Sequence, residues 1–355
     1  MSTSEQLLGE GAYAKVYADK NSALKITEIK SEDDLTACIR EQYVLNMNLP
    51  NTVPYHNFFY KWGSVHITLE RATTDLYKYL IHNRLEDLDH IRDICVQILQ
   101  GVYSLHEHHI IHRDLKPDNI LIKGNTIWLC DFGLSRQFST EYGVPTGYMV
   151  TRWYRAPEIW QKRPYTEKVD MWSIGCIIHK MIYGTVPGKS LPELEVRIPE
   201  LKNESAIHTL MKGLLEFDPF KRWDCKRALA FLGHDPIATV LDRPSDQTWV
   251  KTEKRKEFFH IFYSKFPVEH RVLAHGLMLF DSTEVLKENM FCSMAIAAII
   301  FRTRPSPIVS FCMEHVTADD ICEFATTVCS GRHRLSDWEH FSGSFEEYII
   351  MVNLN

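Results

Sequence analysis

The 355-residue sequence is missing several features that mark specialised classes of protein. Its nine cysteines include no CxxC pair, and the chain has neither internal repeats nor low-complexity tracts. Most of the cysteines lie in apolar helical stretches, where a free thiol behaves as a small hydrophobic side chain. We therefore expect a reducing location, in the cytoplasm, the nucleus or both, rather than a disulfide framework.

Long apolar runs and a strong excess of one charge are also missing. The N-terminal MSTSEQLLGEG has no apolar core of a signal peptide, and the longest strongly apolar run, residues 290–301, is too short to cross a bilayer. The formal net charge of −6 at pH 7 gives no basic excess to displace counterions from nucleic acid. We expect a soluble protein with neither membrane nor nucleic acid among its partners.

Short strand signals fill the first part of the chain, up to about residue 72. Residues 14–17 and 22–26 flank a polar turn, and residues 57–62 and 65–70 flank Gly63, which predicts hairpins. Residues 32–48 interrupt this pattern and predict a helix. We expect a small β-rich lobe over residues 1–72.

Helical periodicity dominates from residue 75. Apolar side chains recur on one face of a predicted helix at Ile91, Ile94, Cys95, Ile98, Leu99, Val102 and Leu105. Residues 168–184 predict another apolar helix. These patterns predict a large helical lobe over about 73–233, and hence an α+β fold with two lobes.

Few periodic apolar positions occur in residues 234–254, which predict a linker. An all-α domain is expected over residues 255–355. Its predicted helices are 255–265, 268–281, 286–301, 306–313 and 317–330. The third is apolar almost all round, as a buried central helix should be.

Five motifs occur in order: GEGAYAKV at 9–16, ALKI at 23–26, HRDLKPDN at 112–119, DFG at 131–133 and APE at 156–158. Glycines without Cβ atoms let a backbone approach phosphates closely. Lys25 within ALKI needs a partner if buried, and Glu41 in the predicted helix is the candidate. The set resembles the protein-kinase family over about residues 1–232, which implies a bilobal kinase fold that uses ATP and Mg²⁺.

The resemblance implies the roles of the motif residues. Asp114 would accept the proton of a substrate hydroxyl, Lys116 would neutralise γ-phosphate charge, and Asn119 and Asp131 would hold the metal. The nucleotide-binding residues that it implies are Gly9, Glu10, Gly11, Val16, Ala23, Lys25, Glu41, Leu69, Glu70, Ala72 and Asp75. Ala14 replaces the third glycine of the family pattern.

Because the catalytic set is present, we expect an active ATP-dependent protein kinase. A lysine at position 116 resembles the catalytic loop of serine/threonine kinases rather than that of tyrosine kinases, so we expect a serine/threonine kinase. The alternative is a pseudokinase-like signalling scaffold that presents the helical domain to partners.

Other segments resemble the group of cyclin-dependent and mitogen-activated kinases. The helix LTACIREQYVL resembles a cyclin-binding helix, and Thr146-Gly147-Tyr148 resembles a dual-phosphorylation motif. The resemblance implies activating phosphorylation at Thr146, with Tyr148 as a second site and Tyr13 as an inhibitory one. The arginines that it implies around phosphothreonine are Arg40, Arg113 and Arg136. Val150 and Arg155 would form a pocket that favours proline after the phosphoacceptor, so we expect Ser/Thr-Pro substrates.

Asp170 and Arg222 resemble structural residues of the large lobe, with Arg222 paired to Glu158. The stretch between Asp170 and Arg222 is short for this kinase group, so an insert used for docking is expected to be missing. The cluster His106, His108 and His109 could suggest a metal, but kinases often carry histidines before the catalytic loop.

Residues 255–340 resemble a cyclin box. The family's kinase-contacting Lys–Glu pair is not clearly reproduced, since Arg302 and Ala325 fall near those positions. If the resemblance holds, the kinase would be activated by its own C-terminal domain, in cis or in trans, or by an external cyclin-like partner. An unrelated helical extension is the alternative.

Overall fold

The computed structural model describes residues 6–11, 14–137, 152–201, 205–237, 276, 287–301 and 307–330. The described residues form two compact units. The first contains the residues up to Asn48, Tyr55–Glu70 and the described residues beyond 240; the second contains Leu49–Pro54 and the described residues from Arg71 to 237. The domain limits 1–233, 234–254 and 255–355 stay predictions.

A five-stranded antiparallel sheet forms the base of the first unit, in the order β1-β2-β3-β5-β4. Its strands are β1 (Leu7–Glu10), β2 (Ala14–Asp19), β3 (Ser22–Glu28), β4 (Tyr55–Lys61) and β5 (Ser64–Glu70). Trp62 and Gly63 connect β4 to β5 with φ angles of 53° and 72°, a left-handed turn that glycine tolerates without strain. The predicted hairpins are confirmed, and the strand ends lie within two residues of the predicted ones.

The predicted helix 32–48 is α1, Glu32–Asn46. Ser31 caps it: the Ser31 hydroxyl accepts a bond from the Asp34 N–H at 3.2 Å, and the Asp34 carboxylate accepts one from the Lys30 N–H at 3.1 Å. The first bond satisfies an amide of the first turn that has no helical partner, and the second ties the residue before the cap to the helix. The helix ends two residues earlier than predicted, because Asn48 takes a left-handed backbone with φ 51°.

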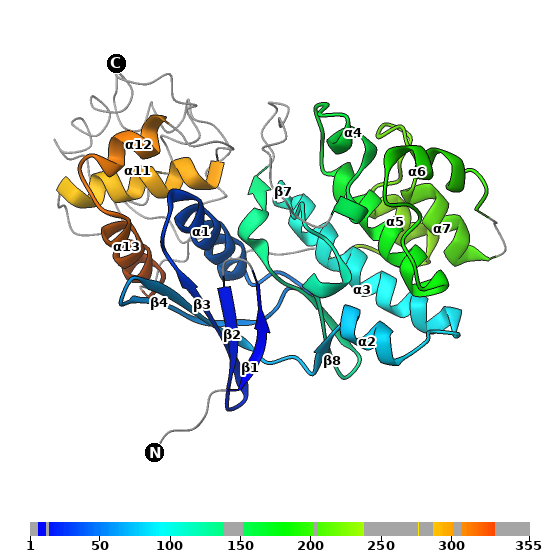
Figure 1. Ribbon diagram of the computed structural model, residues 1–355, viewed down its shortest axis with the longest axis horizontal. Coiled ribbons are helices and arrows are strands. Elements are labelled where there is room, and N and C mark those ends of the chain that lie inside the picture. The colour runs from blue at the N-terminus through cyan, green and yellow to red at the C-terminus, as the bar shows by residue number, and fades with distance from the viewer. Residues whose placement is uncertain are drawn as a thin grey trace. The chain divides into compact units, whose positions relative to one another are not determined.

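Three C-terminal helices complete the first unit: α11 (Lys287–Phe301), α12 (Pro307–Met313) and α13 (Ala318–Ser330). Each begins within one residue of the prediction; the predicted helices 255–265 and 268–281 lie outside the described residues. Figure 1 shows α11 beside α1 and α13 beside β4, with α12 next to α11. Both α11 and α13 pack against α1, and α13 also packs against β4. All described side chains of α11, from residue 291 to 298, are buried, as predicted for a central helix.

The second unit is mainly helical. Its helices are α2 (Leu76–His82), α3 (Leu88–Glu107), α4 (Pro157–Trp160), α5 (Lys168–Tyr183), α6 (Leu191–Arg197), α7 (Ala206–Leu214) and α8 (Cys225–Phe231). Its strands are β6 (Thr74–Asp75), β7 (Ile110–Ile111), β8 (Ile120–Lys123), β9 (Thr126–Leu129) and β10 (Arg136–Gln137). They form a three-stranded sheet in the order β6-β8-β9 and a two-stranded pairing of β7 with β10.

The core of the second unit contains the face of α3 that the sequence predicts. Its seven apolar side chains are each at most 4% exposed. Helix α5 confirms the second predicted apolar helix and packs against α3 and α7. In the part of the chain that the structure describes, no helix combines the length and apolar character needed to span a membrane.

Candidate functional site

Lys25 and Glu41 form a close ion pair within the first unit. Lys25 lies on β3 and Glu41 on α1, and the Lys25 Nζ is 2.6 Å and 2.7 Å from the two carboxylate oxygens. The side chains are 14% and 5% exposed, so either charge would be costly to bury alone. The predicted pairing is confirmed. It holds a positive charge on the sheet at a defined place, from which it can contact a phosphate.

The glycine-rich turn leaves open space beside its backbone. The Gly11 N–H donates to the Ala14 carbonyl at 2.9 Å, which closes the turn between β1 and β2. A Cβ placed on Gly9 would meet no atom within 4 Å, and one on Gly11 would meet only the Ala14 carbonyl oxygen at 3.7 Å. Gly9 lies opposite Val16 across β1 and β2. Another group could therefore approach the backbone of this turn closely. Tyr13 lies outside the described residues.

The remaining nucleotide candidates lie at strand and helix ends. Ala23 and Leu69 are cross-strand neighbours on β3 and β5, and both are buried. The Glu70 carboxylate is 3.0 Å from the His56 Nε2, and the Glu10 carboxylate pairs with Lys15 at the surface.

Ala72 and Asp75 belong to the second unit. The Asp75 carboxylate accepts the Lys78 N–H at 2.8 Å and so caps α2. The sequence did not predict this structural role for Asp75.

Asp170 on α5 anchors the backbone of the HRD segment. Its carboxylate accepts the N–H groups of His112 and Arg113 at 2.8 Å and 2.9 Å, and lies 2.9 Å from the His106 Nε2. Burial raises the pKa of Asp170, but these donors outweigh it and the pKa is lowered. The carboxylate therefore contributes stability at neutral pH that is lost only as the pH falls through this lowered pKa. It also holds Arg113 in a left-handed conformation, with φ 70°, that is unfavourable for a side-chain-bearing residue.

The role of His106 as a partner of Asp170 was not predicted. The run of histidines was the available signal. The neighbouring His108 Nδ1 is 2.7 Å from the Ser104 carbonyl oxygen. Among the described residues, no group of three His, Cys, Asp or Glu side chains is arranged to hold a metal ion.

Asp114, Lys116 and Asn119 converge in the second unit. The Lys116 Nζ is 2.7 Å from the Asp114 Oδ2, and the Asn119 Nδ2 donates to the same oxygen at 2.9 Å. Burial raises the pKa of Asp114, Lys116 opposes that shift, and Asp131 adds to it, so that the pKa is raised. A buried carboxylate of raised pKa between two donors is suited to accept a proton.

Asp131 lies in the DFG segment, close enough to the cluster to influence Asp114 electrostatically. Its backbone is left-handed with φ 64°, and the next residue, Phe132, is fully buried against the His112 ring. The Cys130 N–H donates to the Asn119 carbonyl at 3.1 Å, which ties the two motifs together. The Asp131 carboxylate and the Asn119 amide oxygen are the hard oxygen donors that Mg²⁺ prefers, so the donor set fits this ion.

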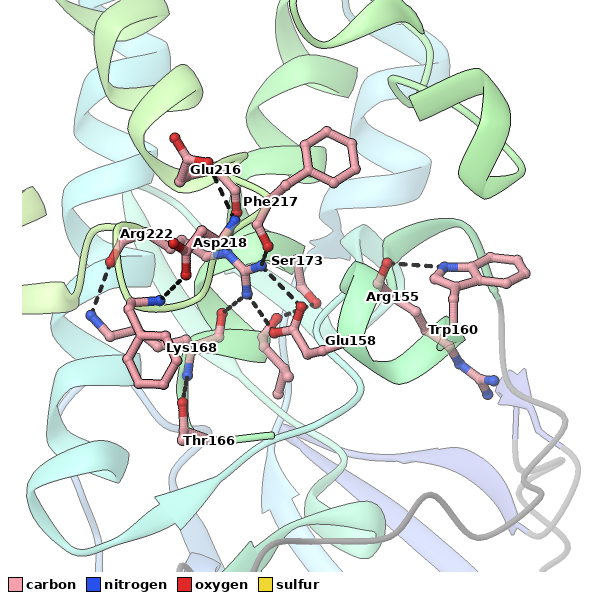
Figure 2. Close-up of polar contacts among 12 residues, drawn as sticks. Arg155, Glu158, Trp160, Thr166, Lys168, Ser173, Glu216, Phe217, Asp218 and Arg222 are labelled. Carbon is pink, nitrogen blue, oxygen red and sulfur yellow. Dashed lines mark hydrogen bonds and ion pairs between the residues drawn. The ribbon is translucent and has the colours of Figure 1, made fainter. Parts of the chain in front are cut away.

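The predicted pair of Arg222 and Glu158 is confirmed (Figure 2). Arg155 lies close by in sequence, but its guanidinium points away from this pair, and its carbonyl accepts the Trp160 indole N–H at 3.1 Å.

The predicted phosphate site depends on residues that the structure describes only in part. Thr146, Tyr148 and Val150 lie outside the described residues, as does the side chain of Arg136. Arg40 lies on α1 in the first unit, and Arg113 lies in the second. The convergence of these arginines on Thr146 stays a prediction.

Comparison with known proteins agrees with the fold. The protein kinase domain model matches residues 2–231, so the chain belongs to the protein kinase family. Members of this family use ATP and Mg²⁺ to transfer phosphoryl groups. The match does not extend over α11, α12 and α13.

Two relatives carry more specific names. The mouse serine/threonine-protein kinase 36 is 32% identical over 235 residues, which cover 61% of this chain and 18% of that protein. The extracellular signal-regulated kinase 1 of Candida albicans is 31% identical over 201 residues, which cover 50% of this chain and 47% of that protein. The chain therefore matches less than half the length of each of these relatives.

Proposed function

We propose that this chain is an ATP- and Mg²⁺-dependent protein serine/threonine kinase. The observation that carries the proposal is the cluster of Asp114, Lys116 and Asn119, anchored through the backbone by Asp170. The bidentate Lys25–Glu41 pair, the family match and the names of the two relatives support it.

The proposed roles follow the chemistry of each side chain. Lys25, oriented by Glu41, binds the nonreacting phosphates of ATP, and the backbone around Gly9 and Gly11 lies close to the phosphates. The backbone around Glu70 and Ala72 binds adenine, and Asp75 lies near the ribose. Bound Mg²⁺, held by Asn119 and Asp131, supplies positive charge against the phosphates.

The transfer step uses Asp114 and Lys116. Asp114 accepts the proton of the substrate hydroxyl as that oxygen bonds to the γ-phosphorus. The bond from phosphorus to the bridging oxygen breaks, ADP leaves, and Lys116 stabilises the negative charge on the transferred group.

The finer proposal concerns substrates and regulation. We infer proline-directed activity from Val150 and Arg155, and activation by a phosphate on Thr146, with Tyr148 as a second site. The resemblance implies that Arg40, Arg113 and Arg136 surround this phosphate. Their like charges would repel one another, and a phosphate carrying about −1.5 to −2 charge would relieve that repulsion. The C-terminal helices would act in cis, in place of an external cyclin-like partner, and their packing against α1 supports this choice.

The purified full-length chain, with no partner added, is expected to phosphorylate a Ser-Pro peptide in preference to the matched Ser-Ala peptide. Thr146→Ala is expected to lower the rate at least tenfold, because the activation segment loses its phosphate. Radiolabelled γ-phosphate transfer measures both effects. Equal use of the two peptides would contradict the proline preference, and activity only after addition of a cyclin-type protein would contradict action in cis. ATP binding without any transfer would favour the scaffold alternative.

The pH profile gives a test of the proton acceptor. Asp114 must be ionised to accept a proton, and its pKa is raised, so activity is expected to fall, as the pH is lowered, at a pH above that of an ordinary aspartate. Lys116 lowers this pKa, so Lys116→Met should move the acid limb of kcat/KM to higher pH, whatever its effect on the maximal rate. The exposed Lys221 provides the matched control, Lys221→Met. A limb that stays in place or moves to lower pH would reject Asp114 as the base.

A further inference from the structure

Helix α13 contacts the helix that carries Glu41 and the edge strand of the sheet that carries Lys25. It packs against α1, which carries Glu41, and against β4, which pairs with β5 in the sheet. Figure 1 shows α13 beside β4 at the edge of the sheet. Helix α13 therefore shares a contact surface with the helix that holds Glu41.

Buried thiols mark the contact between α13 and α1. Cys322 of α13 and Cys38 of α1 are 0% and 2% exposed, and the two thiols lie close enough to interact electrostatically. Burial raises the pKa of the Cys38 thiol to about 12, and Glu41 and Lys25 also influence it. Cys38 lies one helical turn before Glu41. The contact between the two helices, which we call the seam, thus lies one helical turn from Glu41.

A polar contact also joins α13 to β4. The phenol of Tyr60 donates a hydrogen bond to the carboxylate of Asp319, in the first turn of α13. Burial and this hydrogen bond raise the pKa of Tyr60, and the negative charge of Glu323 acts in the same direction. The phenol therefore stays protonated, and a donor, across the physiological pH range.

We propose that Tyr60 and Asp319 are positioning residues for phosphoryl transfer. Their hydrogen bond seats α13 against α1 and so keeps Glu41 where it orients Lys25 toward ATP. Neither residue touches a reacting atom. This inference rests on the proposed kinase activity and adds to it the contact through which the C-terminal helices act.

The test compares variants of the full-length chain. Tyr60→Phe removes the donor and keeps the ring, and is expected to lower kcat/KM for ATP about five- to tenfold, the scale of one ordinary hydrogen bond. The KM for the peptide should change little. Asp319→Ala should match it, whereas Asp319→Asn, which keeps an acceptor oxygen, should restore most of the activity. Tyr77→Phe on α2 and Glu314→Gln after α12 make the same chemical changes at exposed positions away from the seam.

A second readout does not depend on activity. A thiol-specific maleimide, followed by peptide mapping, should label Cys38 and Cys322 faster in Tyr60→Phe than in the wild type, because α13 leaves α1 more often. In the Glu41→Gln background, the kinetic effect of Tyr60→Phe should disappear, since both changes act through one ion pair.

The outcomes separate the two proposals. An active wild type with unchanged ATP kinetics in Tyr60→Phe, or with fully additive effects in the double variant, would overturn the positioning role. An inactive wild type would instead overturn the proposed function. In that case the labelling experiment still tests the contact, because equal labelling of Cys38 and Cys322 in Tyr60→Phe and the wild type would reject its role in seating α13.

Discussion

Asp114→Asn is expected to lower kcat by about 10²- to 10⁴-fold and to leave the Kd for ATP within about twofold of the wild type. The amide has nearly the shape of the carboxylate, but it cannot take up the proton of the substrate hydroxyl. Asp114 lies in the second unit between Lys116 and Asn119, and its proposed role needs no contact with the nucleotide base. The loss should therefore fall on the chemical step rather than on ATP binding.

A control for this variant lies in the same loop. Asp118 is exposed, so Asp118→Asn makes the identical chemical change without touching the cluster and should keep full activity. Single-turnover phosphate transfer and calorimetric ATP binding separate the two steps. If Asp114→Asn kept more than about a tenth of the wild-type rate, another group would have to accept the proton.

Arg222→Met is expected to lower the free energy of unfolding by about 3–5 kcal/mol, because it leaves the Glu158 carboxylate buried without its partner. The Arg222 guanidinium donates to Glu158 at 2.7 Å and 3.0 Å, and also to the carbonyl oxygens of Glu216 and Lys168 at 2.8 Å and 2.9 Å (Figure 2). Arg222 is 1% exposed and lies near the Trp172 ring, so water cannot replace these contacts readily.

The double variant tests this reason. Arg222→Met with Glu158→Leu removes both charges, and should recover part of the lost stability, because no uncompensated ion remains. Arg163→Met, at an exposed position near Glu158, should change the stability by less than about 0.5 kcal/mol. Thermal unfolding should show a fall in Tm of about 6–20 °C for Arg222→Met. A single variant as stable as Arg163→Met, or a double variant less stable than Arg222→Met, would contradict the account.

The local structure around the motifs could be predicted from sequence to a large extent. Hydrophobic periodicity predicted α3 and α5, because a helix on a core must repeat its apolar side chains every three or four residues. The pair Lys25–Glu41 was predictable for a different reason, because a buried charge requires a partner. The pair Arg222–Glu158 was implied by the resemblance to the kinase family. The exact end of α1 was not predictable, since it depends on the left-handed backbone of Asn48.

Two contacts between segments far apart in the sequence could not be predicted from a motif or from hydrophobic periodicity. Tyr60 and Asp319 are 259 residues apart, and each taken alone resembles an ordinary surface residue. His106 appeared only as one of several histidines, and its contact with Asp170 depends on how α3 packs against α5. Such contacts follow from the packing of whole elements, which no short motif encodes.

The sequence by itself determined the order of the catalytic motifs and, through their resemblance to the kinase family, the family and the pairing of Arg222 with Glu158. It also indicated that Lys25 needs a partner, because burying an ion alone is costly. The tertiary structure decided which elements hold those charges in place. It brought α11 and α13 against α1, and Asp170 against the HRD backbone. These arrangements depend on the shape of packed side chains across the unit, a property of the fold as a whole.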